Sequence, residues 1–210
     1  RSPESGGSGV RMTFIVPELA GTDPVGRERD RTALLEEVRG LSESASWPQH
    51  DCEPLLEALV PRLADACAID VLDDTGELER VGARVSGPGS EEIAALLAGR
   101  PLHRAALERT LASQSASVAG VGPETLDELA ADERARELLE RMEISWWVRL
   151  PLLNGGRPIG VLSLGLRASR PDPRDELPFL HELGRSVARG IARAGLVAAV
   201  RDAGERFELI

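Results

Sequence analysis

The sequence predicts an α+β domain built around one antiparallel hairpin that is buried on both faces. Within residues 144–167, two apolar runs flank the turn sequence Asn154-Gly155-Gly156-Arg157. Glycine at the tip supplies the positive φ that a tight hairpin turn requires. Both faces of the hairpin are largely apolar, so other segments have to cover both of them. Segments with helical periodicity elsewhere in the chain are suited to that role.

The hairpin register is predicted from the turn. If Leu153 pairs with Pro158, one face carries Trp146, Val148, Leu150, Leu152, Ile159, Val161, Ser163 and Gly165. The opposite face then carries Trp147, Arg149, Pro151, Leu153, Gly160, Leu162, Leu164 and Leu166. This register places the two adjacent tryptophans on opposite faces, because successive strand residues alternate in direction.

The first part of the chain is predicted to contain two helices and a second hairpin. Its predicted elements are a strand over 10–17, helices over 27–45 and 51–67, and strands over 68–72 and 77–85. Apolar residues recur at helical spacing in both helices. Pro61 lies inside the second helix and should kink or divide it. Asp73-Asp74-Thr75-Gly76 has the composition of a turn between the two strands.

The remaining chain is mainly helical around the central hairpin. Its predicted elements are helices over 90–99, 102–112, 123–131, 132–142 and 175–201, and a short strand over 115–119. Ser90 is a suitable N-cap, and Glu91 and Glu92 follow it in the first turn, where they suit the helix dipole. The last helix carries one apolar stripe, formed by Leu180, Leu183, Val187, Ile191, Ala194 and Ala198.

Composition excludes several classes of function. The 210 residues carry a formal net charge of -10, and all 25 basic residues are arginine, without a segregated basic patch. Such a chain would repel a phosphate backbone, so no nucleic-acid partner is expected. No apolar run approaches the roughly 20 residues of a membrane span. With two cysteines and no signal peptide, we expect reduced thiols and a cytoplasmic location.

Three segments in this order resemble a GAF domain, in the form common in multidomain bacterial signalling proteins. They are PRLADACAIDVLDDTGELERV (61–81), WVRLPLLNGGRPIGVLSLG (147–165) and FLHELGRSVARGIARA (179–194). The resemblance covers roughly residues 51–200, and the hairpin and the final helix are its most specific parts. The sequence departs from the family pattern at Leu150, where valine is usual, and in its Trp146-Trp147 pair.

The resemblance implies a GAF-like, profilin-like fold with an antiparallel sheet of five or six strands. The terminal helices would lie together on one face, and residues 90–142 would form a helical and loop lid over the other. In similar proteins small ligands bind under the lid. The outer helices often pair between subunits, so a homodimer is expected. An output domain in cis is also expected, commonly a phosphatase or a histidine kinase.

The predicted domain organisation follows from these boundaries. Residues 1–26 are expected to form a flexible segment that ends a preceding domain, 27–50 a linker helix, 51–200 the GAF domain, and 201–210 a linker toward a following domain.

The candidate ligand-binding residues all lie on the central hairpin: Trp147, Arg149, Trp146 and Ser163. An aromatic side chain facing a pocket can stack a planar ligand, although both tryptophans can equally fill the core. Arg149 lies in an apolar strand, so it must find a carboxylate, a carbonyl oxygen or an anionic ligand. Asp132, Glu133 or Glu137 of the lid are the protein partners we consider.

The sequence gives little support for catalysis, a metal site or a cofactor. His50, His103 and His181 share no metal-ligand spacing. Asp70, Asp73 and Asp74 favour a strand end and a turn over a cation site. Gly120-Val121-Gly122-Pro123 precedes a helix that could receive an anion, but such turns usually serve only chain reversal. Residues 90–142 contain no cysteine to attach a bilin, and Cys67 is expected to be a buried core residue.

Three functions are compatible with these observations. The first is a non-catalytic regulatory domain that binds a small molecule or relays a signal through its terminal helices. The second is a structural dimerisation module whose interior is filled by its own side chains. The third is a small enzyme, because free-methionine sulfoxide reductases share this fold, but they use several cysteines that this sequence lacks.

Overall fold

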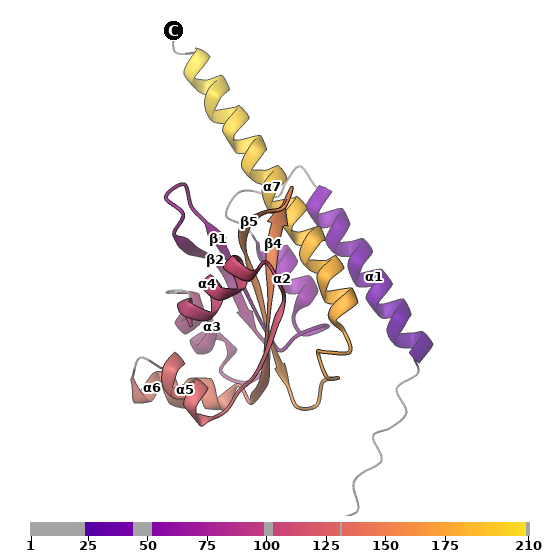
Figure 1. The fold of residues 1–210 in the computed structure, drawn as a ribbon, viewed down its shortest axis with the longest axis vertical. Helices are drawn as coiled ribbons and strands as arrows, with labels where there is room; N and C mark the ends of the chain where they lie inside the picture. The colour runs from indigo at the N-terminus through magenta and orange to yellow at the C-terminus, as the bar shows by residue number, and fades with distance from the viewer. Residues whose placement is uncertain (1–23, 44–51, 99–102, 131, 209–210) are drawn as a thin grey trace, which may run out of the picture.

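A five-stranded antiparallel sheet carries helices on both faces in the computed structural model, which describes residues 24–43, 52–98, 103–130 and 132–208 (Figure 1). The strands are β1 (Ala66–Leu72), β2 (Leu78–Val85), β3 (Ser117–Gly120), β4 (Ile144–Asn154) and β5 (Arg157–Arg167). Their order in the sheet is β2-β1-β5-β4-β3. The predicted α+β fold is confirmed, and the hairpin β4–β5 lies inside the sheet, away from both edges.

The helices divide between the two faces. They are α1 (Pro24–Glu43), α2 (Glu53–Leu59), α3 (Ser90–Ala98), α4 (Arg104–Ser113), α5 (Pro123–Leu129), α6 (Glu133–Arg141) and α7 (Leu177–Glu208). Helices α1, α2 and α7 cover one face, which we call the helix side. Helices α3 to α6 lie over the other face, which we call the lid side (Figure 1). The predicted arrangement of terminal helices and lid is therefore present.

Several element boundaries differ from the prediction. The helix predicted over 51–67 ends at Leu59, and Val60 is already extended, because the residue before a proline avoids the helical region. Strand β1 then begins at Ala66, two residues earlier than predicted. Helix α7 continues through Glu208, beyond the predicted end of 201. The strand predicted over 10–17 lies outside the described residues.

The register of the central hairpin is one residue away from the predicted one. Leu153 pairs with Pro158 as expected, but an irregularity between Leu152 and Leu153 makes Leu152 pair with Gly160. A one-residue slip moves every subsequent side chain to the other face. Trp146, Val148, Leu150 and Leu152 therefore share the helix side with Leu162, Leu164 and Leu166. Trp147 and Arg149 share the lid side with Val161, Ser163 and Gly165.

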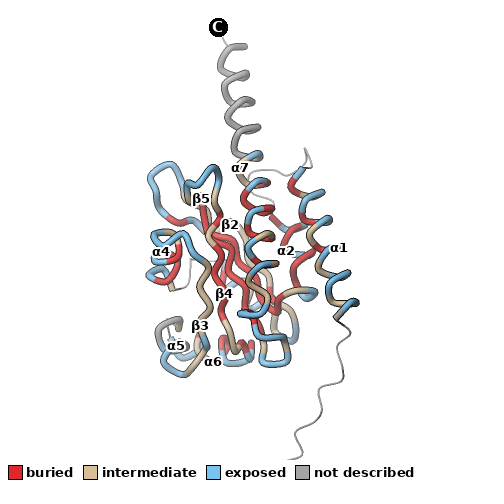
Figure 2. Tube along the Cα trace, turned by 45° about the vertical axis from the view of Figure 1, so that its right-hand side comes forward, coloured by how far each residue is buried: buried red, intermediate tan, exposed pale blue. Residues whose placement is uncertain are grey.

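The larger hydrophobic core lies on the helix side. Its most deeply buried members include Leu55, Leu59, Ile69, Val148, Leu150, Leu162, Leu164, Leu183 and Val187. Figure 2 shows the same distribution, with buried residues along the strands and on the inward sides of α2 and α7. The observed register explains why the larger core is on the helix side, because this register directs the leucines of β5 toward the helices and leaves smaller residues on the lid side.

Helices α1 and α7 lie side by side and run in the same direction (Figure 1). Polar contacts join them in order: Arg31 with Glu176, Arg39 Nη2 with Glu182 Oε1 at 3.0 Å, and Ser42 Oγ with the Ser186 carbonyl oxygen at 3.0 Å. The increasing residue numbers on both helices establish the parallel arrangement. A shift of α7 would therefore displace α1 through these contacts.

Asp65 fastens the start of β1 to the segment after β5. Its carboxylate accepts hydrogen bonds from the Arg167 backbone N–H at 3.0 Å and from Arg170 Nε and Nη2 at 3.2 and 3.0 Å. Burial alone would raise the pKa of this carboxyl, but the hydrogen bonds from Arg170 and Arg167 outweigh burial and hold the pKa below its usual value. The ionised form is therefore the one that stabilises the fold.

We expect Asp65→Asn to lower the free energy of unfolding by about 1.5–3 kcal/mol at pH 7, the range for hydrogen bonds to a charged group. The contribution of Asp65 is fully present above its unfolded pKa of about 3.9 and is lost as the pH falls through the lower folded value. Urea unfolding at pH 7 and pH 3 measures this difference, with Glu92→Gln as the exposed control. An equal loss at both pH values would contradict the prediction.

Candidate functional site

Three neighbouring strands place one polar side chain each in a row on the lid side of the sheet. Arg149 of β4 is paired with Ser117 of β3 on one side and with Ser163 of β5 on the other. Directly opposed residues in antiparallel strands point to the same face. The row continues on β1 with Ala68, which is small. We call Ser117, Arg149 and Ser163 the polar row.

Arg149 is the buried cation of this row, with 5% of its surface exposed. Its Nη2 lies 3.1 Å from Nδ1 of His103, the residue before α4. A guanidinium can only donate, so Nδ1 accepts and the neutral imidazole carries its proton on Nε2. His103 is held at φ 57°, in the left-handed region that few non-glycine residues adopt. The lid therefore offers Arg149 a neutral partner.

The surroundings of Arg149 favour a negative charge. Burial lowers the pKa of its guanidinium, and the nearby positive charge of Arg109 lowers it further. Even so, an arginine stays protonated in a protein. Within the described part of the chain, no carboxylate lies within ion-pair distance of Arg149.

The carboxylates considered from the sequence are engaged elsewhere or exposed. Asp132 caps α6 by accepting a hydrogen bond from the Ala135 N–H at 2.8 Å, and Glu137 lies 3.7 Å from Arg134. Glu133 is exposed in the first turn of α6. The expectation that one of them pairs with Arg149 is wrong, because the lid places α4 and His103 over this part of the sheet.

Ser163 is buried beside Arg149, and its hydroxyl has no hydrogen-bond partner among the described residues. No fully enclosed side-chain nitrogen or oxygen in that same part of the chain lacks a partner. The Ser163 hydroxyl must therefore contact space that water can enter. Ser117 differs, since its hydroxyl lies 3.2 Å from Thr110 Oγ1 of α4.

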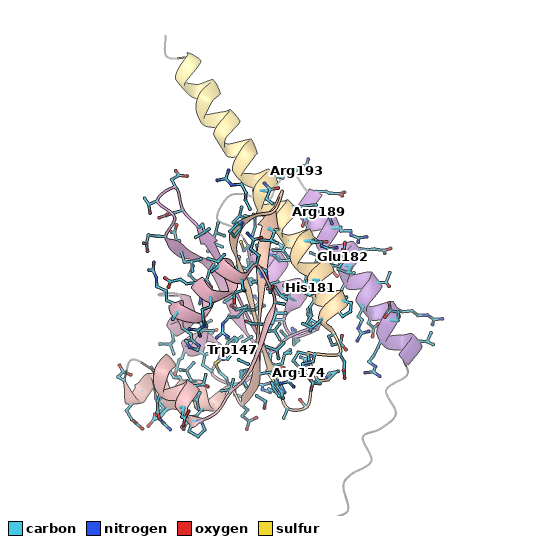
Figure 3. The ribbon with its side chains drawn as sticks, in the orientation of Figure 1. Trp147, Arg174, His181, Glu182, Arg189 and Arg193 are labelled. Atoms are coloured by element: carbon cyan, nitrogen blue, oxygen red, sulfur yellow. The ribbon has the colours of Figure 1, made fainter. Side chains whose placement is uncertain are left out.

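The two tryptophans lie on opposite sides of the sheet, as predicted. Trp147 is on the lid side, where it packs with Leu138 and Met142 of the α6 region and lies over Gly165. Trp146 is on the helix side, with the Arg174 guanidinium 4.5 Å from its ring centroid. Figure 3 labels Trp147 and Arg174 on their different segments. The fold thus brings together Trp147, Arg149 and Ser163 and separates Trp146 from them.

Sequence reasoning missed His103 and Arg109 as members of the site. His103 had been noted only for its lack of metal-ligand spacing. Both residues come from α4 and its N-terminus, and they meet Arg149 only because this helix crosses the sheet. A local pattern carries no signal for such a contact. His181, by contrast, lies exposed on α7 (Figure 3).

The acidic residues after Cys67 do not form a common site. Asp70 is fully buried, and both of its oxygens accept hydrogen bonds from Arg80, at 2.6 and 3.0 Å. Asp73 forms the predicted turn by accepting from the backbone N–H groups of Thr75 and Glu77. Across the described ranges, no group of three histidine, cysteine, aspartate or glutamate side chains gathers as a metal site.

Both cysteines belong to the core on the helix side. Cys52 and Cys67 are buried among the leucines of that core, away from the polar row. Burial raises the pKa of the Cys67 thiol far above neutral pH, so it remains protonated and unreactive. In the helices that the structure describes, none combines the length and apolar character needed to cross a bilayer.

Comparisons with known proteins agree with the fold. The family model of the GAF domain matches residues 48–191. The free methionine-R-sulfoxide reductase of Neisseria meningitidis, solved with its substrate, is 15% identical, with 85% of this chain and 96% of that chain covered and a TM-score of 0.57. The GAF domain of an Acinetobacter phosphoenolpyruvate-protein phosphotransferase is 13% identical, with 84% and 98% covered and a TM-score of 0.55.

A third solved structure is the phycocyanobilin-bound GAF domain of a cyanobacterial phytochrome. It is 14% identical, with 79% of this chain and 96% of that chain covered and a TM-score of 0.50. No curated protein matches the chain. The family match spans well over half of the 210 residues, and the sheet order and two-sided cover agree with it. This chain therefore belongs to the GAF domain family.

Proposed function

We propose that this GAF domain is a non-catalytic regulatory domain that binds a small anionic molecule on the lid side, at Arg149. The observation that carries the proposal is a buried guanidinium that contacts Nδ1 of His103, with the positive charge of Arg109 nearby and no described carboxylate within ion-pair distance. Burying an ionised group without a counter-charge costs several kcal/mol in real proteins. A ligand carboxylate or phosphate would supply that charge and accept hydrogen bonds from the guanidinium.

The neighbouring groups suit the same ligand. The Ser163 hydroxyl can donate to an anion without giving up a protein partner, and Trp147 borders the site with an apolar surface. Other proteins with this fold hold small molecules, among them the phycocyanobilin-bound domain. Both cysteines lie on the helix side, which favours a binding role over the thiol chemistry of a reductase.

The proposed signal passes from the sheet to the terminal helices. Arg149 and Leu150 are consecutive on β4, and Leu150 packs on α7 next to Gly184. A ligand that binds one arrangement of β4 more tightly would shift the population of α7 and of its neighbour α1. We further propose that these helices form a homodimer interface and lead to an output domain in cis in the cytoplasm.

Thermal unfolding of the purified chain tests the anion site with phosphate as the probe. For a dissociation constant of about 1 mM, phosphate at about 10 mM adds about 1.4 kcal/mol of stability. That corresponds to a rise in Tm of about 3–5 °C for a chain of this length, relative to sodium chloride at equal ionic strength. Arg149→Gln should abolish the rise, and Ser163→Ala should reduce it.

Arg157→Gln, at the exposed turn of the central hairpin, is the matched control and should keep the full response. Native mass spectrometry of the same samples should find a bound small molecule in the wild-type chain and in the control, but not in Arg149→Gln. An unchanged phosphate response in both Arg149→Gln and Ser163→Ala would overturn the assignment of the site.

A further inference from the structure

A cavity lies on the helix side of the sheet, separated from the polar row by the sheet itself. Its volume is about 590 Å³, and it opens between α1, the segment after α2, the loop after β5 and the start of α7. Its lining residues are Arg27, Asp30, Arg31, Leu34, Arg62, Leu63, Leu164, Leu166, Ser169, Arg170, Pro171, Pro173, Glu176, Phe179 and Leu180. Leu164 and Leu166 belong to β5, so the cavity reaches the sheet.

The lining is divided into an apolar interior and a charged rim. Leucine side chains from α1, β5 and α7, together with Phe179, form the interior. The rim carries four arginines and two carboxylates, Asp30 and Glu176. The cavity therefore offers apolar surface inside and charged groups at its mouth.

Three of the four arginines are already neutralised. Arg31 forms ion pairs with Glu28 and Glu176. Arg62 pairs with Glu37, and Arg170 pairs with Asp65. These contacts fix the positions of the three guanidinium groups and satisfy their charges within the protein.

Arg27 is different. It is partly buried in the first turns of α1, and within the described residues it has no carboxylate in ion-pair distance. It therefore presents an available guanidinium at the mouth of an apolar cavity. Charge-assisted hydrogen bonds from arginine to a carboxylate are among the strongest in proteins.

We propose that this cavity binds an amphipathic monocarboxylate, with its alkyl or aryl body against Leu34, Leu166 and Phe179 and its carboxylate on Arg27. The volume lies within the range of small-molecule sites, about 300–1,000 Å³. An apolar chain matches the interior, and a single negative charge matches Arg27, which has no carboxylate in ion-pair distance within the described part of the chain. The site is independent of the anion site at Arg149.

Occupancy of this cavity would act on the relative position of the terminal helices. The ligand would contact α1 through Arg27 and Leu34, and α7 through Phe179 and Leu180. Arg31 and Glu176 join the same two helices at the rim. A ligand that fills the space between them stabilises the docked position of α1, since it binds only where both helices are in place.

Isothermal titration calorimetry with sodium decanoate, below its micelle concentration, tests the proposal on the full 210-residue chain. We expect one decanoate to bind in this cavity, and sodium acetate, which lacks the apolar body, should not displace it. Arg27→Gln should weaken decanoate binding roughly tenfold to a hundredfold, the value of a charged hydrogen bond. Leu63→Phe, which fills the cavity, should abolish binding while the circular dichroism spectrum stays unchanged.

Arg29→Gln is the matched control, because Arg29 is exposed on the same helix and does not line the cavity. It should bind decanoate like the wild type, as should Arg149→Gln. Equal affinities of Arg27→Gln and Arg29→Gln, or loss of binding in Arg149→Gln alone, would overturn the proposal. A third result would also overturn it: the wild type binds no decanoate and sediments as a dimer, and Leu63→Phe dissociates that dimer. A second copy of the chain would then be the occupant of the cavity.

Discussion

Asp70→Ala is expected to lower the free energy of unfolding by about 3–5 kcal/mol, the usual cost of removing one partner of a buried ion pair. Asp70 is fully buried, and Arg80 is almost fully buried beside it. The substitution leaves the Arg80 guanidinium enclosed, with the Leu97 carbonyl oxygen at 2.6 Å as its remaining described acceptor. This contact joins the sheet to α3, so the lid should loosen together with the sheet.

Removing one partner of the Asp70–Arg80 ion pair costs much stability, although the intact pair adds little to the free energy of unfolding. Burial raises the pKa of Asp70 in spite of the two hydrogen bonds and the positive charge from Arg80, so desolvation exceeds the attraction. The double variant D70A/R80A should therefore be more stable than D70A alone. Urea unfolding of both variants measures the difference, and Glu92→Ala, which removes an exposed ion pair, should cost less than about 1 kcal/mol. A D70A loss no larger than this control would contradict the prediction.

Gly160→Ala is expected to destabilise the domain by about 3 kcal/mol or more, because the clash is with main-chain atoms in a packed sheet. A Cβ at Gly160 would lie 2.3 Å from the Asp70 carbonyl oxygen and 3.1 Å from the Val71 Cα. Neither atom belongs to a flexible side chain that can rotate away. The pairing of β5 with β1 would have to open at the centre of the sheet to relieve the contact.

Gly184→Ala is the matched control with the opposite sign. A Cβ at Gly184 of α7 would meet Leu150 Cβ at 3.6 Å, an ordinary packing distance. Alanine in a helix interior is favoured over glycine by about 0.5–1 kcal/mol, so this variant should be more stable than the wild type. Thermal unfolding of the two variants side by side gives the answer, and a Gly160→Ala variant with wild-type Tm would refute the steric argument.

The fold was largely accessible from local patterns. The turn Asn154-Gly155-Gly156-Arg157 and the apolar runs around it predicted an internal hairpin, and Leu180, Leu183 and Val187 predicted the buried side of α7. These predictions are strong because the spacing of apolar residues along a helix or strand is visible in the sequence itself. The end of α2 was less accessible, since Pro61 indicated an interruption without fixing where the helix ends.

The register of the hairpin was not accessible in the same way. Both registers give apolar faces, so hydrophobicity alone does not distinguish them. In the observed register, the large ring of Trp147 lies over Gly165, and the leucines of β5 pack against the helices. The pairing of a tryptophan with a glycine was the one signal that could have indicated it.

The sequence by itself determined which residues form the sheet, the terminal helices and the lid, because each element needs a repeated pattern over many residues. Only the tertiary structure decided that Arg149 lies with Ser163 on the lid side and meets His103 in place of a carboxylate. Side chains 46 residues apart meet there because a helix crosses a sheet. That crossing depends on the packing of the whole lid, and no local pattern records it.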